Sequence, residues 1–488
     1  MSSFERKSLN SRPGLIRWLP ASVLLCIVSA LPSAAQTLHI TTTSADLKQA
    51  LSAQPAVTFS TAAPKVNTPR IEVDPAQHFQ SIDGFGASLT DSAAWLLETK
   101  LDTATRRKAM LALFDANEGI GLTILRQPMG GTDLARTHYS YDDMPRGQKD
   151  PALAHFSIAR DEEVILPALR EALAVQPAMK IIATPWSVPA WMKTSGSLIG
   201  GKLRKESYPA FAQYFVKYVQ SYQAAGIPIW AVTLQNEPLY EPKDYMGMKM
   251  SAKEQRDVLR DHFGPAFAKA GLSTKIMVYD HNWDHPEYAA TILSDPAAAR
   301  YAAGTAYHCY GGQVEAQSAT HAQFPDKDIW ETECSGGTWQ KDKAFQSTAE
   351  LVIGTTRNWA RSVVLWGLAL DPDGNPHAGG CGTCRGVITV DDKTQPASFH
   401  PTLDYYVLGQ ASKFVRTGAR RIASSEAAGV MNVAFENPDG SLALLVLNAG
   451  NAPVEFTVAA QGRTAQVTLS GNTLATLDWQ PEAATSIK

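Results

Sequence analysis

The sequence lacks an excess of charge of either sign, because 44 Lys and Arg residues against 47 Asp and Glu residues give a formal net charge of -3. Nucleic-acid-binding proteins usually carry a basic surface, so this balance argues against a nucleic-acid partner. No internal repeat or low-complexity tract stands out. The composition, 44% hydrophobic and 19% charged over 488 residues, is typical of a globular protein with a large core or more than one domain.

Long hydrophobic runs are also scarce, and the prominent one lies near the amino terminus. Basic residues precede the apolar stretch 19–31, and small residues follow it, placed for cleavage after Ala35. The run is shorter than the roughly 20 residues of a spanning helix. The pattern therefore predicts a signal peptide over 1–35 rather than a membrane anchor, and a secreted or periplasmic protein. The basic residues are Arg6, Lys7, Arg12 and Arg17.

Cysteine is rare, with five residues in the chain. Cys26 follows Leu24 and Leu25 rather than a small residue, which disfavours a lipid anchor. A Cys-x-x-Cys pair at 381 and 384 lies in a glycine-rich loop, where a short disulfide is favoured over half a zinc site. The remaining two are expected to be either buried thiols or a second bridge; they are Cys309 and Cys334.

Apolar strand-like runs alternate with helical segments across the middle of the chain. Eight such runs predict a (β/α)8 barrel over 76–410, at 82–86, 122–126, 179–184, 227–234, 275–279, 304–308, 328–331 and 363–368. Residues 206–225 and 252–270 are expected to be helices, the latter capped by Ser251.

The texture changes after residue 410 to short alternating runs separated by turns. Residues 430–435 and 442–447 flank a tight turn and predict a hairpin, which later runs to residue 477 continue. Residues 411–488 are too few for a comfortable sandwich alone. We therefore expect strands from 36–75 to join them in an appended β-sandwich built from both chain ends.

Two carboxylates end predicted strands, Glu237 after the fourth and Glu333 after the seventh. The carboxyl ends of barrel strands hold the chemistry in this fold, and two carboxyl groups about 5 to 5.5 Å apart hydrolyse glycosides with retention. Strand-end carboxylates also bind metals or cap helices. Glu331 is a rival for Glu333, since residues two apart share one face of a strand.

Six motifs in order resemble glycoside hydrolase family 30, especially its glucosylceramidase-like branch. They are 80–86 with Thr90-Asp91, Arg126–Met129 with Thr132-Asp133, 184–191, 233–238 (Thr-Leu-Gln-Asn-Glu-Pro), Tyr307-His308, and Thr332-Glu333-Cys334. The resemblance runs from about residue 71 to the last strands.

This resemblance implies a retaining β-glucoside hydrolase of the glucosylceramidase type, acting through a covalent glucosyl-enzyme intermediate without a metal or organic cofactor. Glu237 is then the acid/base and Glu333 the nucleophile. The resemblance also implies that the glycon is bound by Asp91, Trp186, Asn236 and Trp366. Supporting positions fall to Arg126, His308 and Tyr310.

The sequence departs from the animal glucosylceramidase pattern in the loop 371–385, which leaves the aglycon open. His377 or Arg385 in this loop is a candidate for a substrate contact, against a purely structural role. Endo-β-1,6-glucanase activity is therefore an alternative, and β-xyloside cleavage a third. A non-catalytic glycan-binding protein is the alternative from another class, which would require loss of a key carboxylate. The expected partner is a β-glucoside, either glycolipid or glucan, and the oligomeric state is not predicted.

Overall fold

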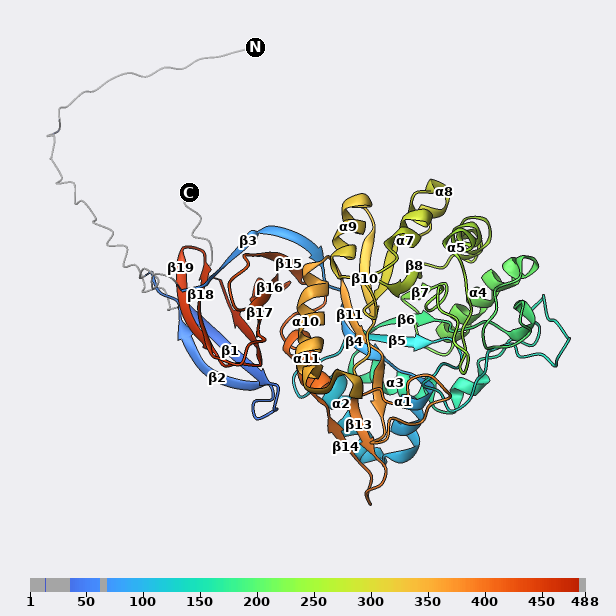
Figure 1. Ribbon diagram of the computed structural model, residues 1–488, viewed down its shortest axis with the longest axis horizontal. Helices are drawn as coiled ribbons and strands as arrows, with labels where there is room; N and C mark the ends of the chain where they lie inside the picture. The colour runs from blue at the N-terminus through green and yellow to red at the C-terminus, as the bar shows by residue number, and fades with distance from the viewer. Residues whose placement is uncertain (1–13, 15–35, 62–67, 482–488) are drawn as a thin grey trace, which may run out of the picture. The chain divides into compact units, whose positions relative to one another are not determined.

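The computed structural model describes residues 14, 36–61 and 68–481, so the predicted signal peptide, apart from residue 14, lies outside the described residues. A sheet of eight parallel strands forms the centre of the fold (Figure 1). Its strands are β4 (Gly84–Ser88), β5 (Ile124–Pro128), β6 (Lys180–Thr184), β7 (Ala231–Thr233), β8 (Lys275–Asn282), β9 (Gly304–His308), β10 (Asp328–Glu333) and β11 (Ser362–Leu365). Strand β11 pairs with β4, and the parallel bridge between Cys334 and Leu365 links β10 to β11, so the sheet closes into a barrel.

All eight predicted strands are present, with ends shifted by a few residues. Each strand is buried along almost its whole length because both of its faces are covered. Inside the barrel the strands contribute one layer of side chains, namely Ile124, Ile182, Ala231, Met277, Ala306, Trp330 and Val364. This layer fills the interior and leaves the carboxyl ends of the strands free for a site.

Helices follow the strands and cover the outside of the barrel (Figure 1). The α-helices are α1 (Asp91–Trp95), α2 (Thr103–Phe114), α3 (Ile165–Val175), α4 (Tyr208–Ala224), α5 (Ala252–Val258), α6 (Gly264–Lys269), α7 (Pro286–Leu293), α8 (Pro296–Ala299), α9 (Glu315–Gln323), α10 (Ala344–Arg357) and α11 (Leu403–Ser412). Two π-helical segments are η1 (Leu96–Lys100) and η5 (Leu259–Phe263), and the 3-10 helices are η2 (Ala159–Glu162), η3 (Ala190–Met192), η4 (Lys205–Ser207) and η6 (Thr338–Lys343). Ser251 and Glu254 form the predicted capping box at the start of α5.

The predicted helix 252–270 runs through α5, η5 and α6, because one π-helical segment, η5, interrupts the α-helical pattern. No helix among the described residues is long and apolar enough to span a membrane.

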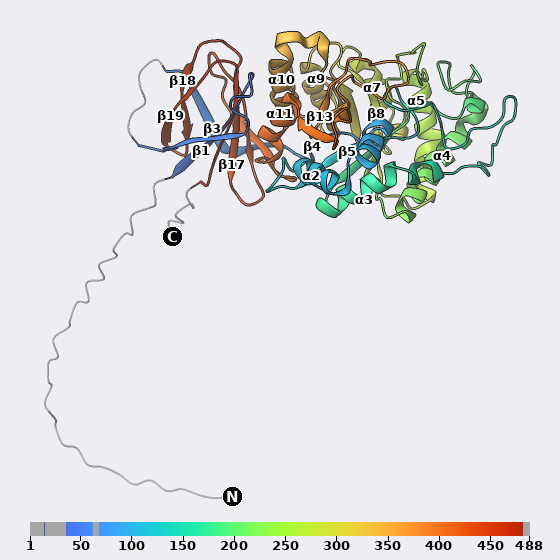
Figure 2. The same cartoon turned by 90° about the horizontal axis from the view of Figure 1, so that it is seen from below.

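Strands from both ends of the chain make the second domain (Figures 1 and 2). They are β1 (Thr37–Ser44), β2 (Ser52–Thr58), β3 (Arg70–Ser81), β15 (Arg420–Ser424), β16 (Met431–Glu436), β17 (Leu442–Asn448), β18 (Val454–Ala460), β19 (Arg463–Leu469) and β20 (Thr473–Trp479). Their hydrogen-bonded order is β19-β18-β3-β15-β16-β17-β20-β1-β2. Leu38 on β1 and Phe456 on β18 share one core although their strands are far apart in this order, so the sheet folds over on itself as a sandwich.

Both predictions about this domain are confirmed. The hairpin of β16 and β17 pairs Met431 with Leu447 in antiparallel register. The amino-terminal strand β1 pairs with β20, so the sandwich is built from both chain ends. A smaller sheet follows the last barrel strand and carries the loop 371–385 between two of its strands. It consists of β12 (Gly367–Leu370), β13 (Gly386–Asp391) and β14 (Ser398–Pro401).

Candidate active site

Glu237 stands just beyond the end of β7, in a turn with an uncommon backbone conformation. Its φ is 43°, in the left-handed region that residues other than glycine rarely adopt. Two backbone hydrogen bonds to neighbouring strand ends hold the turn. Asn236 donates its N–H to Pro185 O at 2.9 Å, and Glu237 donates its N–H to Asp280 O at 2.9 Å. Conformations of this kind cluster at functional sites, where the surrounding structure enforces them. The turn presents the Glu237 carboxylate at the barrel mouth.

Glu333 is the last residue of β10, and a β-bulge separates it from Glu331. Glu331 lies opposite Tyr307 and Glu333 opposite His308, so two residues advance on β10 while one advances on β9. A bulge re-aims side chains, and here it removes the simple alternation that would put both glutamates on one face. Glu331 is fully buried, accepts a hydrogen bond from Val364 N at 2.9 Å, and does not line the cavity described below. Burial raises its pKa to about 8.

The two candidate catalytic carboxylates lie close together across the mouth. One oxygen of Glu237, one of Glu333 and a ring nitrogen of His308 all lie within 4.8 Å of one another. Groups at this spacing are also able to meet a cation. His308 joins the pair, with Nδ1 at 3.2 Å from Glu237 Oε1 and 3.9 Å from Glu333 Oε1. Burial lowers the pKa of His308, but the charges of Glu333 and Asp280 outweigh it and raise the pKa to about 10.

A buried ionic network supports these groups from below. Arg126 is completely buried and contacts the Glu333 carboxylate directly. Its other amino group donates to Asn236 Oδ1 at 2.7 Å and to Asp280 Oδ2 at 2.9 Å. Asp280 also meets His308 Nε2 at 3.1 Å. Removing one partner from such a network would leave an uncompensated buried charge, which costs several kcal/mol.

The two candidate catalytic carboxylates are electrostatically coupled. Glu237, Glu333 and Asp280 offer three negative charges, whereas Arg126 and His308 supply two positive ones. Burial raises the pKa of Glu333, and the like charge of Glu237 raises it further. At Glu237 burial is outweighed by the hydrogen bond and the charge of His308, so its pKa is lowered. Two carboxylates this close titrate as a pair.

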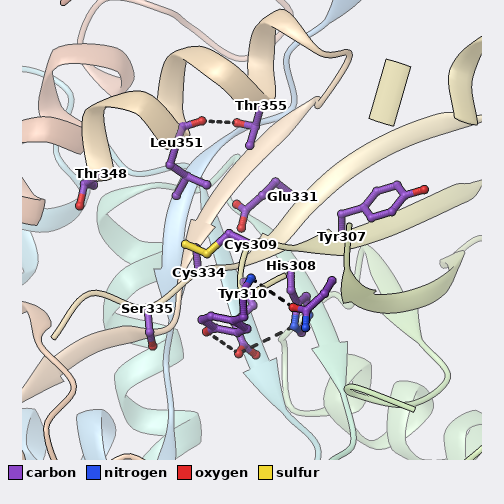
Figure 3. Close-up of a disulfide and its surroundings, with 12 residues drawn as sticks. Tyr307, His308, Cys309, Tyr310, Glu331, Cys334, Ser335, Thr348, Leu351 and Thr355 are labelled. Carbon is purple, nitrogen blue, oxygen red and sulfur yellow. Dashed lines mark hydrogen bonds and ion pairs between the residues drawn. A yellow bond between two sulfur atoms is a disulfide. The ribbon is translucent and has the colours of Figure 1, made fainter. Parts of the chain in front are cut away.

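A disulfide ties together the two strand ends that carry His308 and Glu333. Cys309 and Cys334, which follow these residues directly, are bridged, so the second bridge left open by the sequence is present. Figure 3 shows the disulfide between Leu351 of α10 on one side and Tyr310 and His308 on the other. Tyr310 donates its hydroxyl to Glu333 Oε1 at 2.8 Å. The bridge therefore links β9 to β10 immediately beside the candidate nucleophile.

A cavity of about 450 Å³ opens above the two carboxylates. Most of the predicted site residues line it, and Arg126 and His308 support it from behind. The indole rings of Trp186 and Trp366 stack at 4.7 Å between centroids and form one wall. Apolar ring faces beside carboxylates suit a sugar, which has both C–H and hydroxyl surfaces. The lining residues are Asp133, Trp186, Asn236, Glu237, Tyr240, Asp244, Tyr245, Tyr310, Glu333, Ser335, Trp339, Trp366, Gly380, Cys381 and Cys384.

Asp91 is the exception, and its predicted contact with the glycon needs correction. Both of its oxygens are taken by Arg136, with Nε to Oδ2 at 2.9 Å and Nη2 to Oδ1 at 2.9 Å. Asp91 does not line the cavity, whereas Asp133 does. Asp133 Oδ2 lies 3.4 Å from Trp366 Nε1, and burial, followed by the charge of Glu333, raises its pKa to about 7. Asp133 therefore occupies the place expected for Asp91.

The glycine-rich loop borders the cavity, as predicted, and carries the predicted disulfide between Cys381 and Cys384. At Gly380 the φ is 61°, and a Cβ there would come within 2.5 Å of Asp133 Cβ, so only glycine fits this approach. The two candidate contacts from this region do not reach the cavity. Arg385 pairs with Asp404 at 2.8 Å, and His377 Nδ1 lies 3.2 Å from Gly379 O.

A second cavity of about 740 Å³ adjoins the first and shares Tyr310, Ser335 and Trp339 with it. The most exposed large hydrophobic side chains of the described chain gather around these two cavities. Trp339 is 50% exposed and Tyr240 is 49% exposed. The others are Leu239, which adjoins Tyr240, and Tyr310 and Met431, which line the cavities. This apolar and aromatic surface extends the mouth beyond one sugar ring.

Several residues of the site were missed from the sequence. Asp280 directly follows a predicted strand, and this position at a strand end would have indicated a place in the site. Asp133 belongs to a motif that was recognised, but the neighbouring motif with Asp91 looked equivalent. Tyr240, Asp244 and Tyr245 lie in loops and Trp339 lies in the short η6, and none of the four belongs to a motif of the sequence that predicts a site.

Comparison with known proteins identifies the two domains. The model of the glycosyl hydrolase family 30 TIM-barrel domain matches residues 82–415, and that of the family 30 beta sandwich domain matches residues 418–477. An endo-1,6-beta-D-glucanase of Neurospora crassa is 33% identical over 465 residues, which cover 91% of this chain and 95% of the relative.

Other relatives share the same span. The lysosomal acid glucosylceramidase of Mus musculus is 30% identical over 420 residues, covering 80% of this chain and 79% of that protein. A solved structure of an endo-beta1,6-glucanase has a TM-score of 0.83 and 33% identity, covering 91% of this chain and all of its own.

Proposed function

The chain belongs to glycoside hydrolase family 30, and on that premise we propose that it is an endo-β-1,6-glucanase that retains the configuration of the anomeric carbon. The assignment of the substrate rests on the 33% identity to an endo-1,6-beta-D-glucanase across nearly the whole of both chains. Glycosidase activity itself follows from the family. Glucosylceramide cleavage, the first expectation from the sequence, becomes the second candidate.

The spacing of the two carboxylates supports retention. One oxygen of each lies within 4.8 Å of the other, which is compatible with the separation of about 5 to 5.5 Å between the carboxyl groups of retaining enzymes. Direct attack by one of them on the anomeric carbon fits the available room.

The contacts of each carboxylate support the division of roles. Glu333 is oriented by Arg126 and by the hydroxyl of Tyr310, and both contacts oppose the rise in its pKa that burial and the like charge of Glu237 cause. Glu237 touches His308 alone among these groups and is free to pass a proton to the cavity. Glu333 attacks C1, the bond from C1 to the leaving oxygen breaks, and Glu237 donates its proton to that oxygen.

The second step returns the enzyme to its starting state. The ionised Glu237 takes a proton from water, the water oxygen bonds to C1, and the ester bond to Glu333 breaks. Asn236 lies beside Glu237 and lines the cavity, where its amide is able to meet the sugar hydroxyl next to C1. Trp186 and Trp366 supply the apolar wall for the ring, and Asp133 is in position to accept hydrogen bonds from glycon hydroxyls.

The exposed aromatic surface around the mouth supports a polymeric substrate. Tyr240, Tyr310 and Trp339 stand on the rim, and the adjoining cavity gives room for more than one sugar. Aromatic faces bind successive sugar rings through their C–H surfaces. The glucosylceramide alternative is supported by relatives such as the mouse enzyme, and the same apolar surface would accept a lipid chain.

We also propose that the protein acts outside the cytoplasm. The signal peptide predicted over 1–35 lies, apart from residue 14, outside the described residues. The two disulfides among the described residues support an oxidising compartment, where such bonds persist.

Product analysis on β-1,6-glucan, gentiobiose and glucosylceramide side by side tests the substrate. An endo-acting enzyme shortens the glucan rapidly and releases mixed oligosaccharides before glucose. Proton NMR of the first product identifies the anomer, and retention gives the β-form. Release of glucose from glucosylceramide with an intact glucan would favour the second candidate, and an α-anomer as first product would refute the double displacement.

Two matched variants anchor these measurements. Glu333→Gln should abolish turnover on every substrate, whereas Glu331→Gln should keep most of it, because Glu331 is buried behind the bulge and its raised pKa keeps it neutral near pH 7. If Glu331→Gln were inactive but folded while Glu333→Gln turned over normally, the nucleophile would be wrongly assigned.

A further inference from the structure

The long connection between β5 and η2 contains a cluster of ligating side chains that the catalytic site does not use. This connection, residues 129–158, has no regular secondary structure. Loops of this length inside a compact domain are uncommon and usually functional. One oxygen of Asp142, one oxygen of Asp150 and one ring nitrogen of His155 lie within 4.8 Å of one another.

The Asp142 carboxylate is buried and only half satisfied. Asp142 is 1% exposed, and its Oδ2 accepts a hydrogen bond from Trp191 Nε1 at 3.0 Å. Its Oδ1 is buried as well and has no hydrogen-bond partner among the described residues. Burial of a carboxylate oxygen without a partner is costly, so this atom needs a proton or a cation beside it.

The second carboxylate brings more negative charge to the same place. Asp150 is 6% exposed, and its Oδ2 accepts from His155 N at 2.7 Å and meets His155 Nδ1 at 2.9 Å. The charge of Asp150, after burial itself, is a cause of the raised pKa of Asp142, which is about 6. Arg and Lys residues make no ion pair with Asp142 or Asp150 within the described chain.

We propose that Asp142, Asp150 and His155 bind a divalent transition-metal cation, with Zn²⁺ as its representative. Two carboxylates and an imidazole form a mixed oxygen and nitrogen set, which suits Zn²⁺ or Mn²⁺ better than Ca²⁺ or Mg²⁺. Ligand atoms at about 2.1 Å from a tetrahedral zinc lie about 3.4 Å apart, so no pair of atoms in the set must close by more than about 1.4 Å. The side chain of His155, which is 69% exposed, is free to make that movement.

The expected role of the cation is structural. It would link residue 142 to residues 150 and 155 and so restrain the loop segment between them. The same connection carries Asp133, which lines the catalytic cavity, so the cation would also fix that wall. This inference does not depend on the substrate of the enzyme.

The test is zinc binding by the whole chain, with disulfides intact, any affinity tag removed and metals stripped by a chelator. Isothermal titration with ZnCl₂ should show a site that Asp142→Asn removes, weakening binding by more than the roughly 10- to 100-fold cost of losing an outer-shell partner. Asp143→Asn is the matched control. Asp143 is the next residue, but it accepts from Ser140 N at 2.8 Å and is not part of the cluster. Its affinity for zinc should equal that of the unmodified chain.

The catalytic carboxylates could also bind zinc, so the titration is repeated in the Glu333→Gln background. The equivalent of zinc removed by Asp142→Asn should be lost in both backgrounds. Thermal unfolding gives a second readout, in which ZnCl₂ raises the midpoint of the unmodified chain and not that of Asp142→Asn.

Three results would overturn the proposal. They are no zinc or manganese binding beyond that of Asp142→Asn, equal effects of Asp142→Asn and Asp143→Asn, and preferential binding of CaCl₂ with unchanged affinity in His155→Ala. In the first two cases a proton shared between Asp142 and Asp150 would explain the cluster instead.

Discussion

Loss of the disulfide between Cys309 and Cys334 should destabilise the protein more than loss of the one between Cys381 and Cys384. The two bridges differ mainly in the length of chain that they close, 25 residues against 3. In the chain-entropy account, each bridge removes about 2.1 + 1.5R ln n cal/mol/K from the unfolded state. At room temperature this gives about 3.5 kcal/mol for the longer loop and about 1.6 kcal/mol for the shorter one. The expected difference is therefore about 2 kcal/mol.

The same change should also reduce catalysis, for a separate reason. Cys309 follows His308 and Cys334 follows Glu333, so the bridge restrains both groups at the mouth. A displacement of about 1 Å in a catalytic group can cost roughly 100-fold in rate. The pairing of His308 with Glu333 across β9 and β10 persists without the bridge and limits this movement. We therefore expect a loss of about 10-fold in kcat for Cys309→Ala/Cys334→Ala, with a smaller change in KM.

Urea unfolding followed by intrinsic fluorescence measures the first effect, and hydrolysis of an aryl β-glucoside measures the second. Cys381→Ala/Cys384→Ala is the matched control, because it also removes two sulfurs beside the cavity. Equal free energies of unfolding for the two double variants would refute the loop-length argument. A folded Cys309→Ala/Cys334→Ala variant with undiminished kcat would show that the bridge does not hold the catalytic pair.

Three further predictions concern the catalytic groups. Glu237→Ala should lose about 100- to 10,000-fold on substrates with poor leaving groups and far less on aryl glycosides whose leaving group needs no proton; an equal loss on both would contradict the acid/base role. Tyr310→Phe should lower kcat about tenfold, because a charge-assisted hydrogen bond to Glu333 is worth about 1.5 to 3 kcal/mol and Tyr310 is 44% exposed; an unchanged rate would show that the bond is not used. The pKa of His308 is raised above its ordinary value of 6.5, to about 10, so its contribution to stability is complete below pH 6.5 and declines as the pH rises toward 10. Urea unfolding between pH 6 and 10 should show a steeper fall for the unmodified chain than for His308→Gln, and parallel curves would refute the assignment.

The barrel was predictable because its strands are buried on both faces and therefore appear as apolar runs in the sequence. The ends of those runs also located Glu237 and Glu333. The sequence could not reveal the bulge beside Glu331, since a two-residue alternation assumes a regular strand.

Asp91 and Asp133 illustrate a different limit. Each follows a threonine after a predicted strand, so the local sequence does not distinguish which of the two binds the sugar. The decision depends on Arg136, which lies 45 residues from Asp91 and occupies both of its oxygens. Such a choice of partner is set by tertiary packing and leaves no trace in the spacing of the motif. The positions of Tyr240 and Trp339 on the rim of the cavity could not be predicted for the same reason.

The pairing of β1 with β20 has a consequence for the order in which the chain is assembled. Residues 37–44 of β1 are synthesised near the start, and residues 473–479 of β20 only after the whole barrel. Until β20 arrives, β1 and β17 each present an unpaired strand edge, because β20 lies between them. Open edges are templates for pairing with other chains. A truncation before residue 473 would leave every barrel strand intact but expose the unpaired edges of β1 and β17. We therefore expect the truncated protein to aggregate although its catalytic groups are all present.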